Sequence, residues 1–192
     1  MNSAWALRAS GGGPREGAAL WTAFAAGLAL GGGLTGGLLG LVGVLLPLSP
    51  TTVSVAAAAL AAVALAAYDL RVAAVTLPQR RSLIPQEVFL SSPWAGFVRF
   101  GLEFGSGVRT YVTSAAPYAV VALVLLATDG ALPGLLAGLS FGLGRSVAPL
   151  QAIWADETHW SRDLGGVSRL LERSGSVVVA AVAVLLFVSH VR

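Results

Sequence analysis

Long apolar runs, separated by short stretches rich in proline, glycine and charge, dominate the hydropathy pattern of this chain. A helix needs about 20 predominantly apolar residues to cross a bilayer. Five runs satisfy that length: 19–46, 52–76, 94–128, 131–150 and 174–191. The pattern predicts an all-α fold, a polytopic bundle of transmembrane helices. It forms a single transmembrane domain over 19–192, preceded by a loosely ordered tail at 1–18.

The third of these runs is too long for one simple crossing. At about 1.5 Å per residue, its 35 residues would extend on the order of 50 Å, against a hydrocarbon core of roughly 30 Å. Either the helix breaks near Gly105, Gly107 or Pro117, or the run holds two spans, 94–112 and 115–128. The chain therefore has five spans or six.

The arginines favour five spans, because positively charged loops stay on the cytoplasmic side. With a cytoplasmic N-terminus and five spans, the outer loops 47–51 and 129–130 carry no arginine, and Arg192 alone lies outside. The cytoplasmic segments then hold Arg8, Arg15, Arg80, Arg81, Arg162, Arg169 and Arg173. We predict a multi-pass cell-membrane protein whose N-terminus is cytoplasmic.

Two polar segments lie between the runs. Residues 77–93 contain three prolines and mixed charge, and we expect a cytoplasmic linker there. Residues 151–175 are expected outside the bilayer, with a short amphipathic helix around 167–171.

Composition agrees with a membrane protein. The chain is 56% hydrophobic and 11% charged, with a mean hydropathy of +0.79, whereas soluble domains are about 25% charged. The lipid bilayer is therefore the expected surroundings. The net charge of +3 is scattered, without the basic stripe and interleaved aromatics that nucleic-acid binding needs. The chain has no cysteine, which excludes disulfides and thiol redox chemistry.

Glycines recur at four-residue spacing in two of the runs. Small residues at this spacing let membrane helices approach closely. The predicted helix-packing positions are Gly32, Gly36 and Gly40 in the first run and Gly130, Gly134, Gly138 and Gly142 in the fourth. Residues 31–36 also match the dinucleotide pattern G-x-G-x-x-G. That function is disfavoured, because no strand precedes the glycines and the first acid after them is Asp69.

Two segments of the chain resemble each other. GLALGGGL at 27–34 and GLEFGSGV at 101–108 share one pattern at an offset of 74 residues. Either the chain contains an internal repeat, as many transporters do, or two glycine-rich helices match by chance.

Ionisable residues inside a span are costly and indicate function by default. The candidates for a substrate or ion pathway are Glu103, Arg109, Thr110, Thr113 and Arg145. Arg99 precedes Glu103 by four residues, so the two can pair on one helix face. The cluster is either a pocket that binds an anion or relays a proton, or a set of internally paired charges without a ligand. The same alternatives apply to Asp69 and Arg71, near the inner end of the second span.

The sequence offers no catalytic constellation. The two histidines, His159 and His190, stand 31 residues apart without a metal-binding motif. No nucleophile, base and orienting residue can be assembled, so we expect a non-enzymatic protein without a metal or cofactor.

The stretch GLEFGSGVRTYVTSAAPYAVVALVLLATDGALPGLLAGLSFGLGR resembles the paired fourth and fifth spans of the CcdA/DsbD-type membrane proteins of cytochrome c biogenesis. Gly101-Leu102-Glu103-Phe104 matches that family's glycine-rich entry, Gly142-Leu143-Gly144 matches the end of its next helix, and the linker from Leu77 to Arg81 is similar to its mid-chain loop. The resemblance covers about 27–150. The family passes electrons through intramembrane cysteines, and the aligned position here falls near Tyr111. The resemblance therefore implies a cysteine-free relative without thiol–disulfide transfer.

Two functions follow from these observations. The first is a membrane carrier of a small solute or ion, or a degenerate relative of one, that uses the polar intramembrane residues. The alternative is an accessory membrane subunit that docks a partner protein, or a second copy, through its glycine-rich helix faces.

Overall fold

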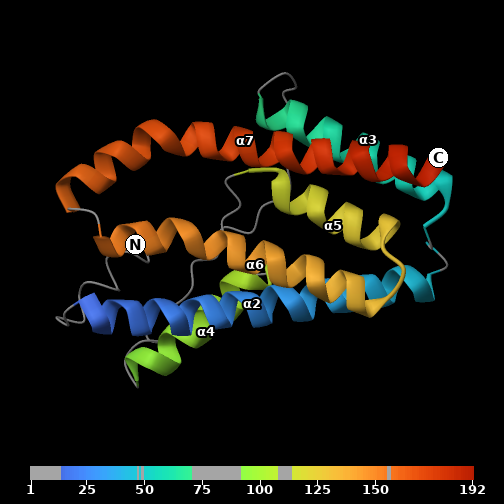
Figure 1. The fold of residues 1–192 in the computed structure, drawn as a ribbon. Coiled ribbons are helices and arrows are strands. Elements are labelled where there is room, and N and C mark those ends of the chain that lie inside the picture. The colour runs from blue at the N-terminus through green and yellow to red at the C-terminus, as the bar shows by residue number, and fades with distance from the viewer. Residues whose placement is uncertain (1–13, 47, 49, 71–91, 108–113, 155–156) are drawn as a thin grey trace. The chain divides into compact units, whose positions relative to one another are not determined.

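The computed structural model describes residues 14–46, 48, 50–70, 92–107, 114–154 and 157–192 (Figure 1). These residues form α-helices and connecting turns, which confirms the all-α prediction for the described part of the chain. The helices are α2 (Pro14–Leu45), α3 (Thr52–Asp69), α4 (Pro93–Gly105), α5 (Ala116–Ala127), α6 (Ala131–Trp154) and α7 (Glu157–Val191).

Three stretches of these described helices are long and apolar enough to cross a membrane. They are Arg15–Leu45 in α2, Thr52–Asp69 in α3 and Arg173–Val191 in α7. Within the most apolar window of each, 39%, 28% and 11% of the residues are buried inside the protein, so much apolar surface faces outward. A set of largely exposed apolar helices is compatible with a protein embedded in a bilayer.

Two helices extend beyond the bounds that the sequence pattern suggested. The predicted tail 1–18 overlaps α2, which begins at Pro14 because proline suits the first helical turn and Glu16 complements the helix dipole there. Residues 151–175, expected outside the bilayer with a short helix around 167–171, are mostly helical, since α6 continues to Trp154 and α7 begins at Glu157. No proline follows Pro149, so no later helix position lacks its backbone N–H donor. The predicted end of the second span, residue 76, and residues 77–91 of the linker lie outside the described residues.

The sequence sets the start of α3 through a capping box. The Thr51 hydroxyl accepts a hydrogen bond from the Ser54 backbone N–H at 3.1 Å, and the Ser54 hydroxyl accepts one from the Thr51 N–H at 2.8 Å. These two bonds satisfy backbone donors that a helix start leaves without an intrahelical partner.

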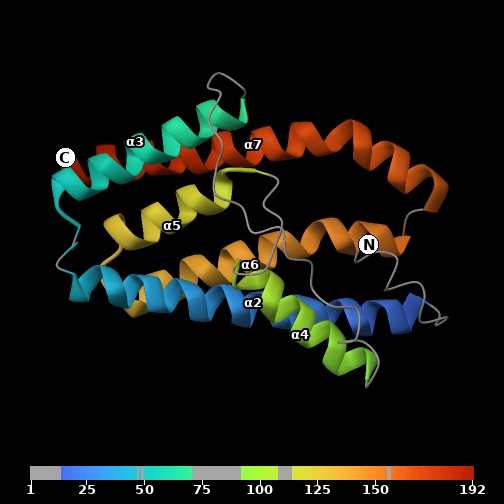
Figure 2. The same cartoon turned by 180° about the vertical axis from the view of Figure 1, so that it is seen from behind.

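The chain divides into two compact units, each assembled from three separate segments. The first unit holds Met1–Thr35, Arg80–Thr110 and Gly138–Leu164, and the second holds Gly36–Gln79, Tyr111–Ala137 and Gly165–Arg192. The core of the first unit comes from α2 and α4, which lie side by side in both Figure 1 and Figure 2; its buried residues are Leu20, Ala23, Phe24, Leu28 and Phe97.

The core of the second unit is built from alanine. Ala59 and Ala62 of α3, Ala119 of α5 and Ala183 of α7 are buried together, and larger side chains such as Leu65 pack around them. Side chains this small let the three helices approach closely. Figure 2 shows α3, α5 and α7 running alongside one another.

Glycines mark the crossing of α2 and α4 in the first unit. A Cβ atom on Gly27 would overlap the carbonyl oxygen of Val98, and a Cβ atom on Gly101 would overlap that of Phe24. One turn further on, Gly31 faces the carbonyl of Leu102 in the same way. The backbones are therefore in direct contact.

The contacts across this crossing are reciprocal. Gly31 meets the carbonyl of Leu102, and Gly105 meets that of Leu28. Residues 28 and 102, like residues 31 and 105, are 74 positions apart, which is the offset between the two similar sequence segments. The similar segments pack against each other around a local twofold axis, so both need glycine at the equivalent positions.

The two glycine rows singled out in the sequence face each other. In the first unit a Cβ on Gly32 would overlap the carbonyl oxygen of Gly138 and lie 3.4 Å from the Cα of Gly142, and a Cβ on Gly142 would overlap the carbonyl oxygen of Leu28. In this unit α2 and α6 are therefore antiparallel.

In the second unit, glycines of α2 again lie against the backbone at and just before the start of α6. A Cβ on Gly134 would overlap the carbonyl oxygen of Gly36, and one on Gly40 would overlap that of Gly130. Gly130 itself precedes α6 and has a φ of 108°, which favours glycine for a conformational reason as well.

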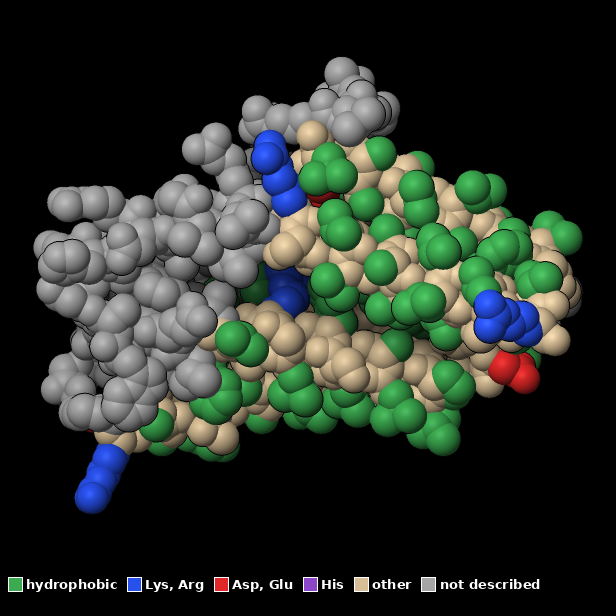
Figure 3. All heavy atoms as spheres, turned by 45° about the horizontal axis from the view of Figure 1, so that its top comes forward, with side chains coloured by type: hydrophobic (Ala, Val, Ile, Leu, Met, Phe, Trp, Pro, Cys, Tyr) green, Lys and Arg blue, Asp and Glu red, His purple; other side chains and the backbone are tan. Residues whose placement is uncertain are grey.

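The described surface is strongly apolar. Figure 3 shows one face of the molecule. Hydrophobic side chains are spread across its described residues, with few charged groups among them. Leu34 and Leu38 of α2, Leu60 of α3 and Leu185 of α7 are each more than half exposed. Contiguous apolar surface of this extent is rare on monomeric soluble proteins.

Candidate functional site

The apolar run 94–128 is interrupted in the structure. Helix α4 ends at Gly105 and α5 begins at Ala116. Their 13 and 12 residues correspond to lengths of about 20 and 18 Å, and each is shorter than the roughly 30 Å core of a bilayer. Neither helix is long enough to cross that core alone. The break falls at Gly105 and Gly107, two of the positions that the sequence indicated, and Gly107 has a φ of 71°.

Three carbonyl groups at the end of α4 accept hydrogen bonds from identified donors. The last four carbonyls of a helix have no intrahelical donor. Here the Leu102 carbonyl accepts from the Ser106 backbone N–H at 3.0 Å, and the Glu103 carbonyl accepts from the Ser106 hydroxyl at 2.8 Å. The Phe104 carbonyl accepts from Nη1 of Arg145 at 2.9 Å. The end of α4 is thus capped by a cation from α6.

Arg145 also stacks on aromatic rings. Its guanidinium carbon lies 3.7 Å from the centre of the Phe104 ring and 5.6 Å from that of Phe141. The face of an aromatic ring and the C-terminus of a helix are both partially negative, so both attract the cation.

An aromatic stack supports this end of α4. The Phe100 and Phe104 rings lie 5.9 Å apart and nearly parallel, and the Phe24 ring of α2 lies 5.3 Å from Phe100. On the same helix as Phe24, Trp21 donates from Nε1 to the carbonyl oxygen of Ser146, next to Arg145, at 2.8 Å. Side chains of α2, α4 and α6 therefore fix the position of the guanidinium.

Glu103 pairs with Arg99, as their spacing predicted. Nε of Arg99 lies 3.2 Å from Oε1 of Glu103, with the arginine side chain 65% exposed and the glutamate 15% exposed. The pair joins an exposed cation to a mostly covered carboxylate on one face of α4. Glu103 directly precedes Phe104, the residue whose carbonyl accepts from Arg145.

Of the predicted pathway residues, Arg145 contacts the end of α4 through Phe104, and Glu103 is the preceding residue of that helix. Arg109, Thr110 and Thr113 lie outside the described residues. The aromatic stack and the cap on the Phe104 carbonyl could not be found from sequence, because Phe24 and Phe100 are 76 positions apart and Arg145 and Phe104 are 41 positions apart.

A second charged residue caps the other side of the interruption, within the second unit. The backbone N–H of Ala115, at the start of α5, points at both carboxylate oxygens of Asp69, at 2.8 and 2.7 Å. The hydroxyl of Ser176, in α7, also donates to Asp69. An anion at a helix N-terminus is favourable. The carboxylate, at the end of α3, therefore joins three helices.

Sequence reasoning identified Asp69 as a charge near the end of a span, but it did not predict this role. Its partners are a backbone amide 46 residues away and a serine 107 residues away. The available signal was the pair of serines, Ser174 and Ser176, at the start of the last apolar run.

Among the described residues, no group of three or more histidine, aspartate and glutamate side chains is placed to hold a metal ion. Comparison of the chain with known protein families, with characterised proteins and with solved structures gives no match.

Proposed function

We propose that this integral membrane protein carries a small solute or ion, and that the end of α4 forms part of its pathway. One observation carries the proposal. The helix in the long apolar run stops at Gly105, and a cation from another helix binds the Phe104 carbonyl at that end. Irregular backbone at membrane depth is tolerated where it is buried in protein or lines a water-filled cavity. Broken helices of this kind bind ions and substrates in transporters.

The chemistry at this end suits a small anion or a proton. Among its contacts with described residues, the Arg145 guanidinium uses one hydrogen bond, to the Phe104 carbonyl, out of five N–H donors. The remaining donors can bind an anion. Glu103, the preceding residue of α4, offers a carboxylate that can accept and release a proton.

Flux into liposomes tests the proposal. Purified protein is reconstituted in liposomes that contain a pH-sensitive dye or, in a parallel set, a chloride-sensitive dye, under imposed gradients of protons or chloride. We expect at least one flux to exceed that of protein-free liposomes and to fall at least tenfold in Arg145→Gln. Arg192→Gln, which removes an exposed terminal charge, is the matched control and should transport normally. Fluxes equal to those of empty liposomes for the whole set would contradict the proposal.

We rank the accessory-subunit alternative second, because it relies on glycine faces that would have to be free for a partner. Gly32, Gly40, Gly134 and Gly142 contact neighbouring helices of the same chain. A protein that transports nothing but purifies with one stable membrane partner would reverse this ranking. The relationship to the CcdA/DsbD-type family stays a prediction.

A further inference from the structure

An open apolar groove runs between α3 and α7, within the second unit. Its volume is about 610 Å³. Val63, Ala66 and Leu70 line it from α3, and Val177, Ala180 and Val184 line it from α7. Ala66 is buried, whereas Leu70, Val177 and Val184 are 40–46% exposed, so small side chains form the floor and larger ones the rims.

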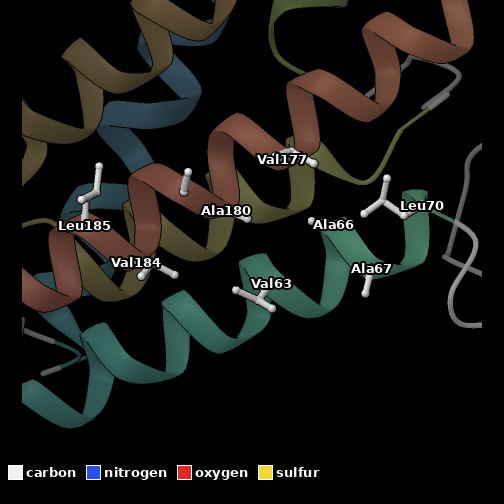
Figure 4. Close-up of a pocket in the computed structure, with 9 residues that line it drawn as sticks. Val63, Ala66, Ala67, Leu70, Val177, Ala180, Val184 and Leu185 are labelled. Atoms are coloured by element: carbon white, nitrogen blue, oxygen red, sulfur yellow. The ribbon is translucent and has the colours of Figure 1, made fainter.

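The groove has two distinguishable ends. Figure 4 shows Leu70 and Val177 at one end, with Val63 and Val184 toward the other. From Val177 to Val184 the groove extends about 10 Å along α7. Residues four apart share a helix face, so Arg173 lies one turn beyond Val177, on the groove side of the helix. The Arg173 side chain is exposed.

The shape of the groove suits a single hydrocarbon chain better than a helix. A helix with its side chains is about 10–12 Å across and associates in a bilayer through small or polar interface residues. The rims here carry branched side chains, and the lining offers no hydrogen-bonding side chain. The nearby carboxylate of Asp69 is held by the Ala115 amide and the Ser176 hydroxyl.

We propose that the groove holds one acyl chain of an anionic phospholipid, whose phosphate binds Arg173. The apolar slot and the exposed cation beyond its end match the two halves of such a lipid. Basic sites between transmembrane helices, at the cytoplasmic side, bind anionic headgroups, and the arginine distribution assigns Arg173 to that side. The proposal needs the bilayer but not the transport function, so either one can fail without the other.

Native mass spectrometry of the purified full-length protein tests this binding. The probes are palmitoyl-oleoyl phosphatidylglycerol and palmitoyl-oleoyl phosphatidylcholine, which share their acyl chains and differ in net charge. We expect the protein to retain one phosphatidylglycerol in preference to phosphatidylcholine. Arg173→Gln should weaken phosphatidylglycerol binding about fivefold, the effect of roughly 1 kcal/mol for one arginine near an anionic lipid. Arg192→Gln, at the other end of α7, should leave it unchanged.

Filling the groove tests the acyl-chain half of the proposal. Ala180→Phe places a ring in the slot and should reduce retention of both lipids at least fivefold. Val182→Phe, a comparable change at a 46% exposed position of α7 outside the lining, should not. Equal retention of the two lipids by the unmodified protein would overturn the proposal, as would normal retention in Ala180→Phe. A lipid-free dimer that Ala180→Phe dissociates would show instead that a second copy fills the groove.

Discussion

The guanidinium of Arg145 donates to the carbonyl oxygen of Phe104 at 2.9 Å and lies over the ring of the same residue. One side chain of α6 thus caps the C-terminus of α4 and covers its last aromatic ring. At the start of α5, Asp69 accepts from the Ala115 amide. The cation of Arg145 therefore lies at the C-terminus of α4, and the anion of Asp69 lies at the N-terminus of α5, as the helix dipoles favour.

Replacing Arg145 should destabilise the protein. Arg145→Leu removes the donor to the Phe104 carbonyl and the contact with the ring, so we expect the free energy of unfolding to fall by about 1–3 kcal/mol. Arg145→Lys keeps the charge but loses the planar stacking, so its free energy of unfolding should lie between those of the unmodified protein and Arg145→Leu. Unfolding in mixed micelles measures both. Arg15→Gln, an exposed charge of α2, is the control; if it costs as much as Arg145→Leu, the cap is unimportant.

Asp69 should hold the first turn of α5 in place. Asp69→Ala leaves the Ala115 amide without its carboxylate acceptor, and losing an N-terminal cap costs about 0.5–2 kcal/mol. Hydrogen exchange at residues 115–119 should accelerate by a corresponding factor, while exchange in α2 stays unchanged. Asp69→Asn retains an acceptor oxygen and should lose less protection. The exposed Asp129 provides the control, since Asp129→Ala should leave exchange in α5 unaltered.

A methyl group at Gly101 should separate α4 from α2. The Cβ of Gly101→Ala would overlap the backbone of Phe24, which cannot move aside as a flexible side chain can. We expect about 1–3 kcal/mol of destabilisation. Gly144→Ala is the matched control, because a Cβ there meets nothing within 4 Å. That variant should be neutral or more stable by up to about 1 kcal/mol, since alanine favours helix more than glycine does. Equal effects at the two sites would contradict the observed crossing.

These features differ in how far the sequence could predict them. Apolar periodicity is local, so the helices follow from the sequence, as does the pairing of Arg99 with Glu103 four residues apart. Glycine spacing showed which residues could allow close approach, but not that Gly32 faces Gly138 or that Gly27 faces Gly101. The partner of a small residue is set by helix order and register, which one-dimensional spacing does not contain. The carbonyl that Arg145 caps is likewise a backbone group, and such groups leave no trace in sequence.

The polar segment 151–175 shows that polarity alone does not predict the extent of a helix. Charge and polarity in 151–175 predicted a segment outside the bilayer with a short helix, whereas α7 is continuous from Glu157. Polarity shows which solvent a segment prefers, but a polar segment can still be helical. For residues 151–175, the polar pattern therefore indicates a preference for water but does not indicate whether the backbone is helical.

Labelling of single introduced cysteines can determine the number of spans, because the chain has no cysteine of its own. Single cysteines introduced into this cysteine-free chain react with a membrane-impermeant maleimide in intact cells only where they face outside. With five spans and a cytoplasmic N-terminus, Arg192→Cys should be labelled and Ser3→Cys should not. With six spans, Arg192→Cys should be protected as well. Ser49→Cys lies in an outer loop and Ser82→Cys in an inner one under both models, so they calibrate the labelling. Because neither α4 nor α5 is long enough to cross alone, we expect the five-span result.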